Sequence, residues 1–293
     1  MSDIPTEASC PICSHFAAYV GKRQGRLDSR FFFYFHCNFC RFSFIGNPRT
    51  DYAEIYSDAY YRGRGADPLA DYVYELENPL RTIRNYEWRG VLAIFKELCP
   101  QGGRWLDFGC GAGGLVRFAR EAGQDAVGFE EGWGASAARE AGIPVLRLED
   151  LEGYAAQFDF VSAIEVFEHI ADPVSALRQV RKLLKPGGKL FLTTGNAKPW
   201  RQNLLDWSYT SVPEVHISFF EPETLSHALR AVGFEPRAGR LFSGFSNILK
   251  FKVLKNLKFK NRSAVIDLLP WGLLARIVDA KYQTSAQPYG VAE

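Results

Sequence analysis

The chain has 293 residues, 47% of them hydrophobic, and a formal net charge of +2 at pH 7. This length allows one large hydrophobic core with a smaller unit beside it, and the charge balance neither favours nor excludes nucleic acid as a partner. No stretch reaches the roughly 18 consecutive apolar residues of a membrane span, and the start, MSDIPTEASC, has no feature of an export signal. We therefore expect a cytoplasmic protein.

Two CxxC pairs mark residues 1–48 as a zinc-ribbon module. Each pair can hold two thiolates on one tight turn, and two pairs complete a tetrahedral zinc site; four buried thiols without metal are the alternative. Because a site of four thiolates has no open position, we predict a structural zinc ion. An aromatic run between the pairs, residues 31–35, predicts a strand. The predicted ligands are Cys10, Cys13, Cys37 and Cys40.

Residues 49–100 form a polar and aromatic segment, which we predict to be a helical linker or cap. In its second half, Ile83, Tyr86, Gly90 and Ile94 recur at helical spacing.

From Arg104 the pattern changes to alternating strands and helices. In one predicted helix Val174, Leu177 and Val180 share a face, and the Pro-Gly-Gly that begins at Pro186 ends it. Such alternation predicts an α/β domain, residues 101–293, with a parallel sheet and helices on both faces.

A glycine-rich loop follows the first strand of this domain and precedes a helix. Its glycines allow a sharp turn and close approach of the backbone to a ligand. Asp107 begins the loop, where it can meet a ligand amine, and Glu130 ends the next strand, where a carboxylate accepts from ribose hydroxyls. Glu149 or Asp150 ends a later strand, near an expected adenine edge. The loop residues predicted to bind a cofactor are Gly109, Cys110, Gly111 and Gly113.

Residues 158–196, with the blocks EVFEH and LKPGG, resemble the class I S-adenosylmethionine (SAM)-dependent methyltransferases. The pattern is similar to the branch that includes ubiquinone-biosynthesis O-methyltransferases, and it covers about residues 100–240 together with the glycine loop and Glu130. The resemblance implies a Rossmann-like sheet of seven strands, SAM as cofactor, Glu165 beside it, and a cap formed by residues 49–100. It disfavours a dehydrogenase, which would carry a separate substrate domain.

The cap predicted from the resemblance would include three tyrosines, a tryptophan and an arginine: Tyr60, Tyr61, Tyr86, Trp88 and Arg89. Packing in a helical layer is the alternative for these side chains. The N-terminal module is similar in kind to zinc modules of some nucleotide-sugar C-methyltransferases and of an rRNA methyltransferase.

Three side chains are candidates for chemistry. Methyl transfer needs an aligned acceptor, and a base if the acceptor keeps its proton. His216, between the fifth strand and the next helix, and His169, after the fourth strand, are candidate bases; a structural hydrogen bond to backbone is the alternative for each. Glu165 is a candidate for shaping the site. No [DN]PP[YFW] tetrapeptide follows the fourth strand, which disfavours N-methylation of adenine or cytosine.

A basic stretch lies near the C-terminus. Residues 236–266 contain eight Lys or Arg, and Ile248, Phe251, Leu254 and Leu257 are spaced to share one helix face. We expect a helical insertion at about 245–282, before a final strand that is short or runs differently from the usual one. A solvated basic face, contact of 248–278 with an anionic membrane surface, and binding of a polyanion are the three interpretations.

The expected function is methyl transfer from SAM to oxygen or carbon of a small or carrier-linked metabolite, such as a sugar nucleotide or a quinone-like compound. The alternatives are an RNA or protein methyltransferase that uses the ribbon and the basic stretch to hold substrate, and a non-catalytic SAM-binding scaffold. Nucleic acid is the less favoured partner, and the acceptor and the oligomeric state are not encoded in any recognisable pattern.

Overall fold

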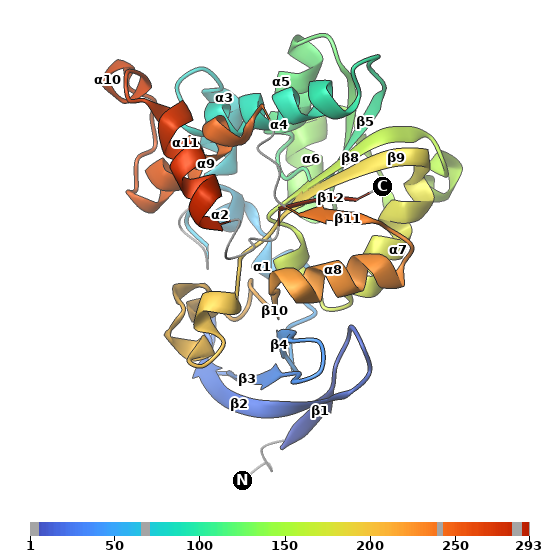
Figure 1. Cartoon of the computed structure of the whole chain (residues 1–293), viewed down its shortest axis with the longest axis vertical. Helices are drawn as coiled ribbons and strands as arrows, with labels where there is room; N and C mark the ends of the chain where they lie inside the picture. Colours follow the sequence, from blue (N-terminus) through green and yellow to red (C-terminus); the bar gives the residue numbers. More distant parts are fainter. Residues whose placement is uncertain (1–5, 66–70, 239–242, 283–288, 293) are drawn as a thin grey trace.

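A computed structural model describes residues 6–65, 71–238, 243–282 and 289–292 (Figure 1). Its centre is a seven-stranded sheet in the order β11-β12-β9-β8-β5-β6-β7, and a five-stranded sheet in the order β1-β2-β3-β4-β10 lies at the N-terminal end. The large-sheet strands are β5 (Arg104–Phe108), β6 (Asp125–Phe129), β7 (Val145–Leu146), β8 (Phe158–Ile164), β9 (Leu184–Thr193), β11 (Pro236–Ala238) and β12 (Tyr289–Ala292).

Five of these strands, β5 to β9, are joined by parallel pairing, whereas β12 pairs antiparallel with both β9 and β11. The parallel α/β sheet is confirmed, but the parallel part has five strands rather than seven. The final strand, β12, has four residues and runs antiparallel to β9. Residues 239–242, which follow β11, lie outside the described residues.

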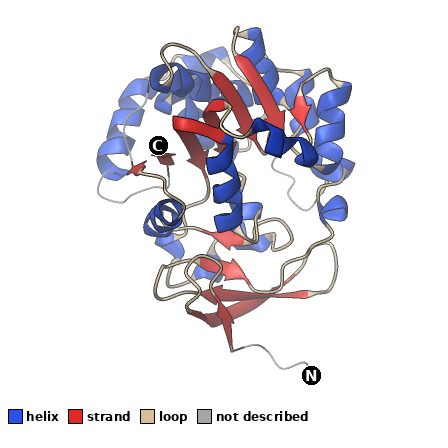
Figure 2. Ribbon diagram, turned by 90° about the vertical axis from the view of Figure 1, so that its right-hand side faces the viewer, coloured by secondary structure: helices blue, strands red, loops and turns tan. Residues whose placement is uncertain are grey.

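Both faces of the large sheet are buried under helices (Figure 2). Neighbouring residues of β5 point to opposite sides, so Trp105 belongs to one core cluster and Leu106 to the other. The first cluster includes side chains of α4 and α5, and the second includes side chains of α7 and α8 and of the N-terminal sheet. The helices are α4 (Arg84–Leu98), α5 (Gly114–Glu121), α6 (Gly132–Glu140), α7 (Pro173–Leu183) and α8 (Pro222–Ala231).

Helix α7 begins at Pro173, after Asp172, whose carboxylate accepts a hydrogen bond from Ser175 N. Its apolar face, Val174, Leu177 and Val180, is buried as predicted. The chain enters β9 at once, so the Pro-Gly-Gly lies inside the strand rather than in a separate turn.

The small sheet joins the N-terminal module to the rest of the chain. β4 pairs with β10, which comes from the segment after β9. Thr224 Oγ1 of α8 donates a hydrogen bond to the carbonyl of Cys40 at 2.7 Å, and Phe42 packs against Phe220. The predicted boundary at residue 48 therefore falls after β4 but inside one continuous core. The strands are β1 (Glu7–Ser9), β2 (Phe16–Gln24), β3 (Phe31–His36), β4 (Ser43–Ile45) and β10 (Ser218–Phe219).

Residues 49–100 form the predicted helices, and the C-terminal insertion adds three more. Helix α9 crosses α4 where Gly90 meets Gly244: a Cβ on Gly90 would lie 2.8 Å from the Gly244 carbonyl oxygen. This close approach buries Ile248, Phe251 and Leu254. The helices are α1 (Tyr52–Ile55), α2 (Asp58–Tyr61), α3 (Tyr72–Glu77), α9 (Phe245–Asn256), α10 (Ala264–Asp267) and α11 (Trp271–Tyr282). Within the described parts of the chain, no helix is long and apolar enough to cross a membrane.

Candidate functional site

A cavity of about 780 Å³ opens at the carboxyl ends of β5, β6 and β8, a volume typical of sites for small molecules. In an open parallel sheet, ligands bind at this edge. One wall is the glycine loop, another is the segment after β8, and aromatic residues of α1 to α4 close the top.

The glycine loop holds conformations that favour glycine. Gly109 and Gly111 line the cavity with φ of 77° and 55°. A Cβ on Gly109 would lie 2.5 Å from Val166 Cγ2, so this position has no room for a side chain. Gly113, with φ of 83°, does not line the cavity; a Cβ there would lie 2.8 Å from Ile143, so this glycine serves packing of α5. Cys110 lines the cavity and is buried.

Glu130 lies at the end of β6 with its carboxylate tied to the loop. Gly111 N donates to one oxygen at 2.9 Å, and Glu131 N donates to the other at 3.0 Å. Burial raises the pKa of Glu130, and these two amides act in the opposite direction. The carboxylate is thereby fixed on the cavity wall as an acceptor for ligand hydroxyls.

Asp107 lines the cavity from the end of β5. Trp105 Nε1 donates to Ser162 Oγ at 2.8 Å, and Ser162 donates to Asp107 Oδ1 at 2.6 Å, which fixes the carboxyl group. Burial raises the pKa of Asp107 to about 7. A cationic ligand group beside it would favour the ionised form.

Glu165 follows β8 with φ of 56°, a left-handed conformation that is costly for a residue with a side chain. Its amide donates to the Thr193 carbonyl at 2.9 Å, and Lys252 Nζ of α9 lies 2.8 Å from its Oε1. The carboxylate is partly buried, which raises its pKa, but Lys252 holds the pKa well below the usual range. Glu165 therefore stands on the cavity wall as a fixed anion paired with a cation.

Tyr209 bridges two carboxyl groups. Its hydroxyl lies 3.0 Å from Glu165 Oε2 and 2.8 Å from Glu168 Oε1. A single hydroxyl proton can serve only one of these contacts, so the other contact requires a proton on a carboxyl group. Glu168 is the fully buried member, and burial together with the charge of Glu165 raises its pKa to about 8. Glu168 is thus neutral at pH 7 and Glu165 ionised.

The two histidines differ in their relation to the cavity. His169 lines it, and its Nδ1 lies 2.9 Å from the Val215 carbonyl, so the neutral ring carries its lone pair on Nε2. His216 does not line the cavity. It stacks on Tyr209 with ring centroids 3.9 Å apart, and its Nδ1 lies 3.0 Å from the Tyr209 carbonyl. The structure thus places His216 behind the cavity wall, as a support for Tyr209.

Two further predicted residues lie away from the cavity. Glu149 is exposed and pairs with Arg147 at 3.6 Å, and Asp150 accepts from Arg147 N at the start of a 3₁₀ segment. Leu148 lines the cavity instead. Asp150 thus caps the 3₁₀ segment and Glu149 pairs with Arg147, and neither side chain lines the cavity.

Several cavity residues were missed at the sequence level. Arg84 of α4 is buried between Glu75 at 3.0 Å and Glu87 at 2.7 Å, and Lys255 of α9 completes this charged wall. The only sequence signal for Arg84 was the charge pattern of α4, and the same pattern is typical of an ordinary solvated helix. Of the predicted cap, Tyr60, Tyr61 and Trp88 line the cavity, while Tyr86 packs on α9 and Arg89 is exposed. Tyr52, Tyr56 and Tyr72 extend the aromatic layer.

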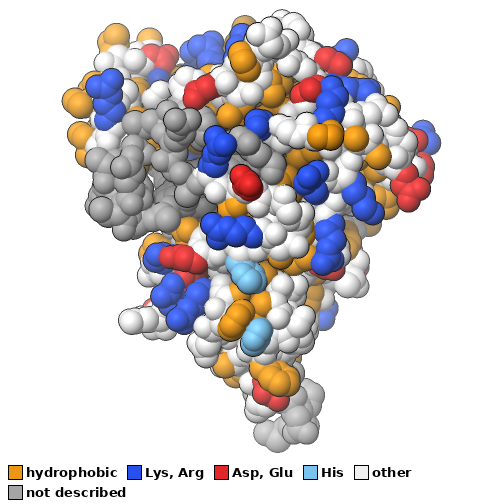
Figure 3. Space-filling model, turned by 45° about the vertical axis from the view of Figure 1, so that its right-hand side comes forward, with side chains coloured by type: hydrophobic (Ala, Val, Ile, Leu, Met, Phe, Trp, Pro, Cys, Tyr) orange, Lys and Arg blue, Asp and Glu red, His pale blue; other side chains and the backbone are white. Residues whose placement is uncertain are grey.

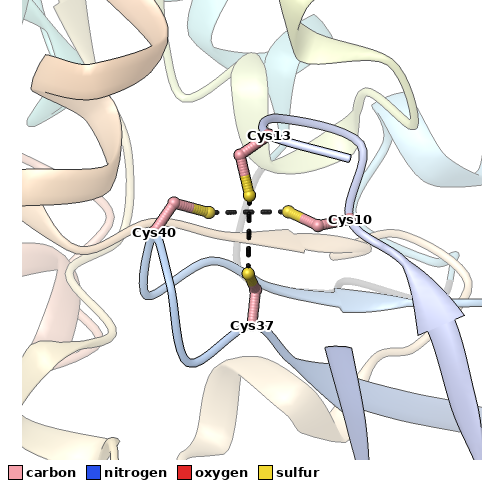
Figure 4. Close-up of side chains that lie close together, drawn as sticks. All are labelled: Cys10, Cys13, Cys37 and Cys40. Atoms are coloured by element: carbon pink, nitrogen blue, oxygen red, sulfur yellow. Dashed lines mark hydrogen bonds between the residues drawn. The ribbon is translucent and has the colours of Figure 1, made fainter. Parts of the chain in front are cut away.

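The four N-terminal cysteines converge on one point (Figure 4). Their sulfur atoms all lie within 4.8 Å of one another, with Cys10 to Cys40 and Cys13 to Cys37 each at 3.5 Å. A tetrahedron with Zn–S distances of about 2.3 Å has S–S edges of roughly 3.8 Å. The cluster therefore has the dimensions of a zinc site.

The two CxxC turns repeat one backbone geometry. Ser14 and Arg41, each directly after the second cysteine, have φ of 61° and 65°. Their amides donate to the carbonyls of Cys10 and Cys37, in both turns at 2.9 Å. Two unrelated segments thus adopt the same tight turn, which directs four thiols inward.

Comparison with known proteins shows where these features recur. Residues 80–238 match a family described as a methyltransferase domain. The chain is 33% identical over 180 residues to a ubiquinone biosynthesis O-methyltransferase of Cereibacter sphaeroides, a match that spans 50% of this chain and 66% of the relative. It is 29% identical to the protein of the same name from Bordetella avium, over 66% of this chain and 85% of that relative.

A similar solved structure is a SAM-dependent methyltransferase of Thermotoga maritima, described as a possible histamine N-methyltransferase. It is 27% identical, with a TM-score of 0.40, over 52% of this chain and 73% of that one. Residues 1–79 and 239–293, which include the four cysteines and helices α9 to α11, lie outside the matched family region.

Proposed function

The chain belongs to the class I SAM-dependent methyltransferase family, and from this we propose that it transfers the methyl group of SAM to a hydroxyl oxygen of a small, quinone-like acceptor. The observation that carries the proposal is Glu130, fixed by two amides on the wall of a cavity that the glycine loop enters. The names of the curated relatives support oxygen as the methylated atom.

The cavity residues fit SAM by their chemistry. Glu130 offers a carboxylate to vicinal hydroxyls, and Gly109 and Gly111 leave the backbone open to close approach. Asp107 and Glu165 provide carboxylates for a ligand that carries an ammonium and a sulfonium. When bound, SAM supplies an electrophilic methyl group for in-line attack by an acceptor oxygen.

The residues of the chain then align the acceptor and take its proton. Tyr56 and Tyr60 give the upper wall of the cavity flat apolar surfaces, which suit a planar acceptor. His169 has its Nδ1 hydrogen bond to the Val215 carbonyl, so Nε2 can receive the hydroxyl proton.

For the N-terminal module we propose a structural zinc ion held by the four cysteines. The sulfur distances and the paired turns support this assignment. The ion would close a site without an open position and hold β1 to β4 against β10 and α8.

The proposed function is tested by calorimetric titration of SAM and S-adenosylhomocysteine into the wild type and two glutamate variants. Glu130→Ala is expected to weaken binding at least about tenfold, because ligand hydroxyls lose a fixed acceptor. Glu140→Ala is the matched control, since its side chain is exposed at the end of α6 and does not line the cavity. Equal binding by both variants, or none by a folded wild type, would contradict the proposal.

Transfer itself is tested with SAM and a panel of catechols and hydroquinones. His169→Gln is expected to lower kcat, with most of the loss recovered at high pH, where the acceptor ionises without a base. His216→Gln is the control, because that ring lies outside the cavity.

A further inference from the structure

The helices α10 and α11 expose an unusual amount of apolar surface at the outer edge of the molecule (Figure 1). In α10, no side chain is buried, and among the described side chains of α11 only Ala275 is. Leu268 is 84% exposed and Val265 73% exposed. We call this apolar surface the outer face; its residues are Val265, Leu268, Leu269, Leu273, Leu274 and Ile277.

Such a concentration is not explained by folding of the chain itself. Single exposed apolar side chains are common. Six exposed apolar side chains within 13 successive residues mark a surface that contacts a partner. In α9, by contrast, Ile248, Phe251 and Leu254 are buried against α4, while Val253 and, just beyond the helix, Leu257 and Phe259 are exposed. The outer face lies beyond this packed layer, on the side of α9 that faces away from the core.

The segment that carries the outer face is mainly basic: residues 245–282 contain eight Lys or Arg and two acidic residues, Asp267 and Asp279. Lys258, Lys260 and Arg276 are exposed. Asp267 is occupied within the chain: its Oδ1 accepts from the Tyr86 hydroxyl at 2.6 Å and contacts Lys250, and its Oδ2 lies 3.6 Å from Arg262. The segment therefore carries an excess of positive charge.

The contacts of Asp267 also anchor α10 and α11. Asp267 ties the end of α10 to α4 and α9, and Trp271 Nε1 donates to the Ile266 carbonyl at 2.7 Å. Apolar side chains are thus held outward on an anchored scaffold with a basic margin. On the different face shown in Figure 3, Lys and Arg side chains are dispersed among acidic and apolar ones.

We propose that the outer face docks on an anionic lipid surface, with its leucines inserted at the headgroup boundary and Lys258, Lys260 and Arg276 against lipid phosphates. A bilayer interface offers both components at once, an apolar layer and a negative margin. The exposed apolar helices and the excess of Lys and Arg over acidic residues in this segment favour this occupant over a neutral apolar protein surface. The proposal does not depend on SAM binding.

The test is sedimentation of the full chain with vesicles of phosphatidylcholine alone and of phosphatidylcholine with about one third phosphatidylglycerol. We expect binding to the anionic vesicles, weakened by salt, and much weaker binding to the neutral ones. Leu268→Ser with Ile277→Ser is expected to lower the partition coefficient at least about tenfold, since each buried methylene contributes roughly fourfold. Lys258→Gln with Lys260→Gln should lower it on anionic vesicles only.

Phe16→Ser with Val20→Ser is the matched control, because these apolar side chains are exposed on β2, in the small N-terminal sheet. The control should sediment like the wild type. Absence of binding to anionic vesicles, or equal binding by the Leu268, Ile277 variant, would overturn the proposal. A dimer in gel filtration that this variant converts to a monomer, without vesicle binding, would identify a second copy as the occupant and overturn it as well.

Discussion

Lys252 Nζ lies 2.8 Å from Glu165 Oε1, so a helix of the C-terminal insertion neutralises the carboxylate that follows β8. The same ammonium lies 3.7 Å from Glu87 of α4. The insertion is therefore part of the cavity wall and not an appendage, although the matched family region ends before it.

Lys252→Met should lower the free energy of unfolding by about 1–3 kcal/mol, because it leaves Glu165 in the cavity wall without its cation. Since Lys252 is partly exposed, the effect is expected to be smaller than that for a fully buried ion pair. The pKa of Glu165 is depressed in the folded state, so this contribution is present above the unfolded pKa of about 4.3 and declines as pH falls below it. Urea denaturation at several pH values measures it.

The control for this pair is Lys258→Met, at an exposed lysine just beyond α9. A double-mutant cycle with Glu165→Gln isolates the coupling. A coupling energy near zero at pH 7 would show that the ion pair contributes nothing.

Cofactor affinity should rise with pH through about 7 because Asp107 must ionise to meet a cationic ligand group, and burial raises its pKa to about 7. Below that pKa the affinity should fall by up to about tenfold per pH unit. Titration of S-adenosylhomocysteine from about pH 5.5 to about pH 8.5, a range that brackets this pKa, gives the profile. Asp107→Asn should bind weakly with a flatter profile; an unchanged slope in that variant would assign the titration to another group.

Glu168 should make the protein less stable as pH rises. Its pKa is about 8 in the folded state, above the unfolded value, so between about pH 4.5 and 8 the folded state holds a proton that the unfolded state has lost. Stability from this group is full below about pH 4.5 and is lost by up to about 1.4 kcal/mol per pH unit across that window. Glu168→Gln should remove this component of the slope, whereas Glu131→Gln should leave the wild-type slope.

Removal of the proposed zinc ion should destabilise more than the ribbon. Because Cys40 and Phe42 contact α8 and the segment after β10, loss of the cluster also exposes the main core. Cys37→Ser is expected to lower the zinc content from about one ion per chain and to reduce Tm by roughly 10 °C, equivalent to about 3 kcal/mol. Cys99→Ser should retain the metal. A metal-free wild type with unchanged Tm would contradict the assignment.

Local patterns predicted the elements whose conformation is set nearby in the chain. The CxxC pairs, the glycines at 109 and 111, and the apolar face of α7 each depend on residues a few positions apart, and the structure places them accordingly. The resemblance to the family predicted the sheet. The weak apolar pattern at the C-terminus predicted a final strand that is short or runs differently from the usual one, and β12 has four residues.

Long-range contacts set the rest. Nothing near Lys252 indicates that it meets Glu165, and the ring of His216 is withdrawn because Tyr209 stacks between it and the carboxylates. Asp150 has a capping role that competes with any ligand role, and only the position of the 3₁₀ segment decides between them. Such choices depend on the assembled fold, which spacing alone does not contain.

The pairing of β4 with β10 has a consequence for synthesis on the ribosome. Ser218 is the partner of Phe44, 174 residues later in the chain. The N-terminal module leaves the ribosome first, yet its sheet edge stays open until most of the protein has been translated. During that interval the proposed zinc ion would be the main constraint on the module, so expression in zinc-poor medium should reduce the soluble yield before any effect on mature protein is seen.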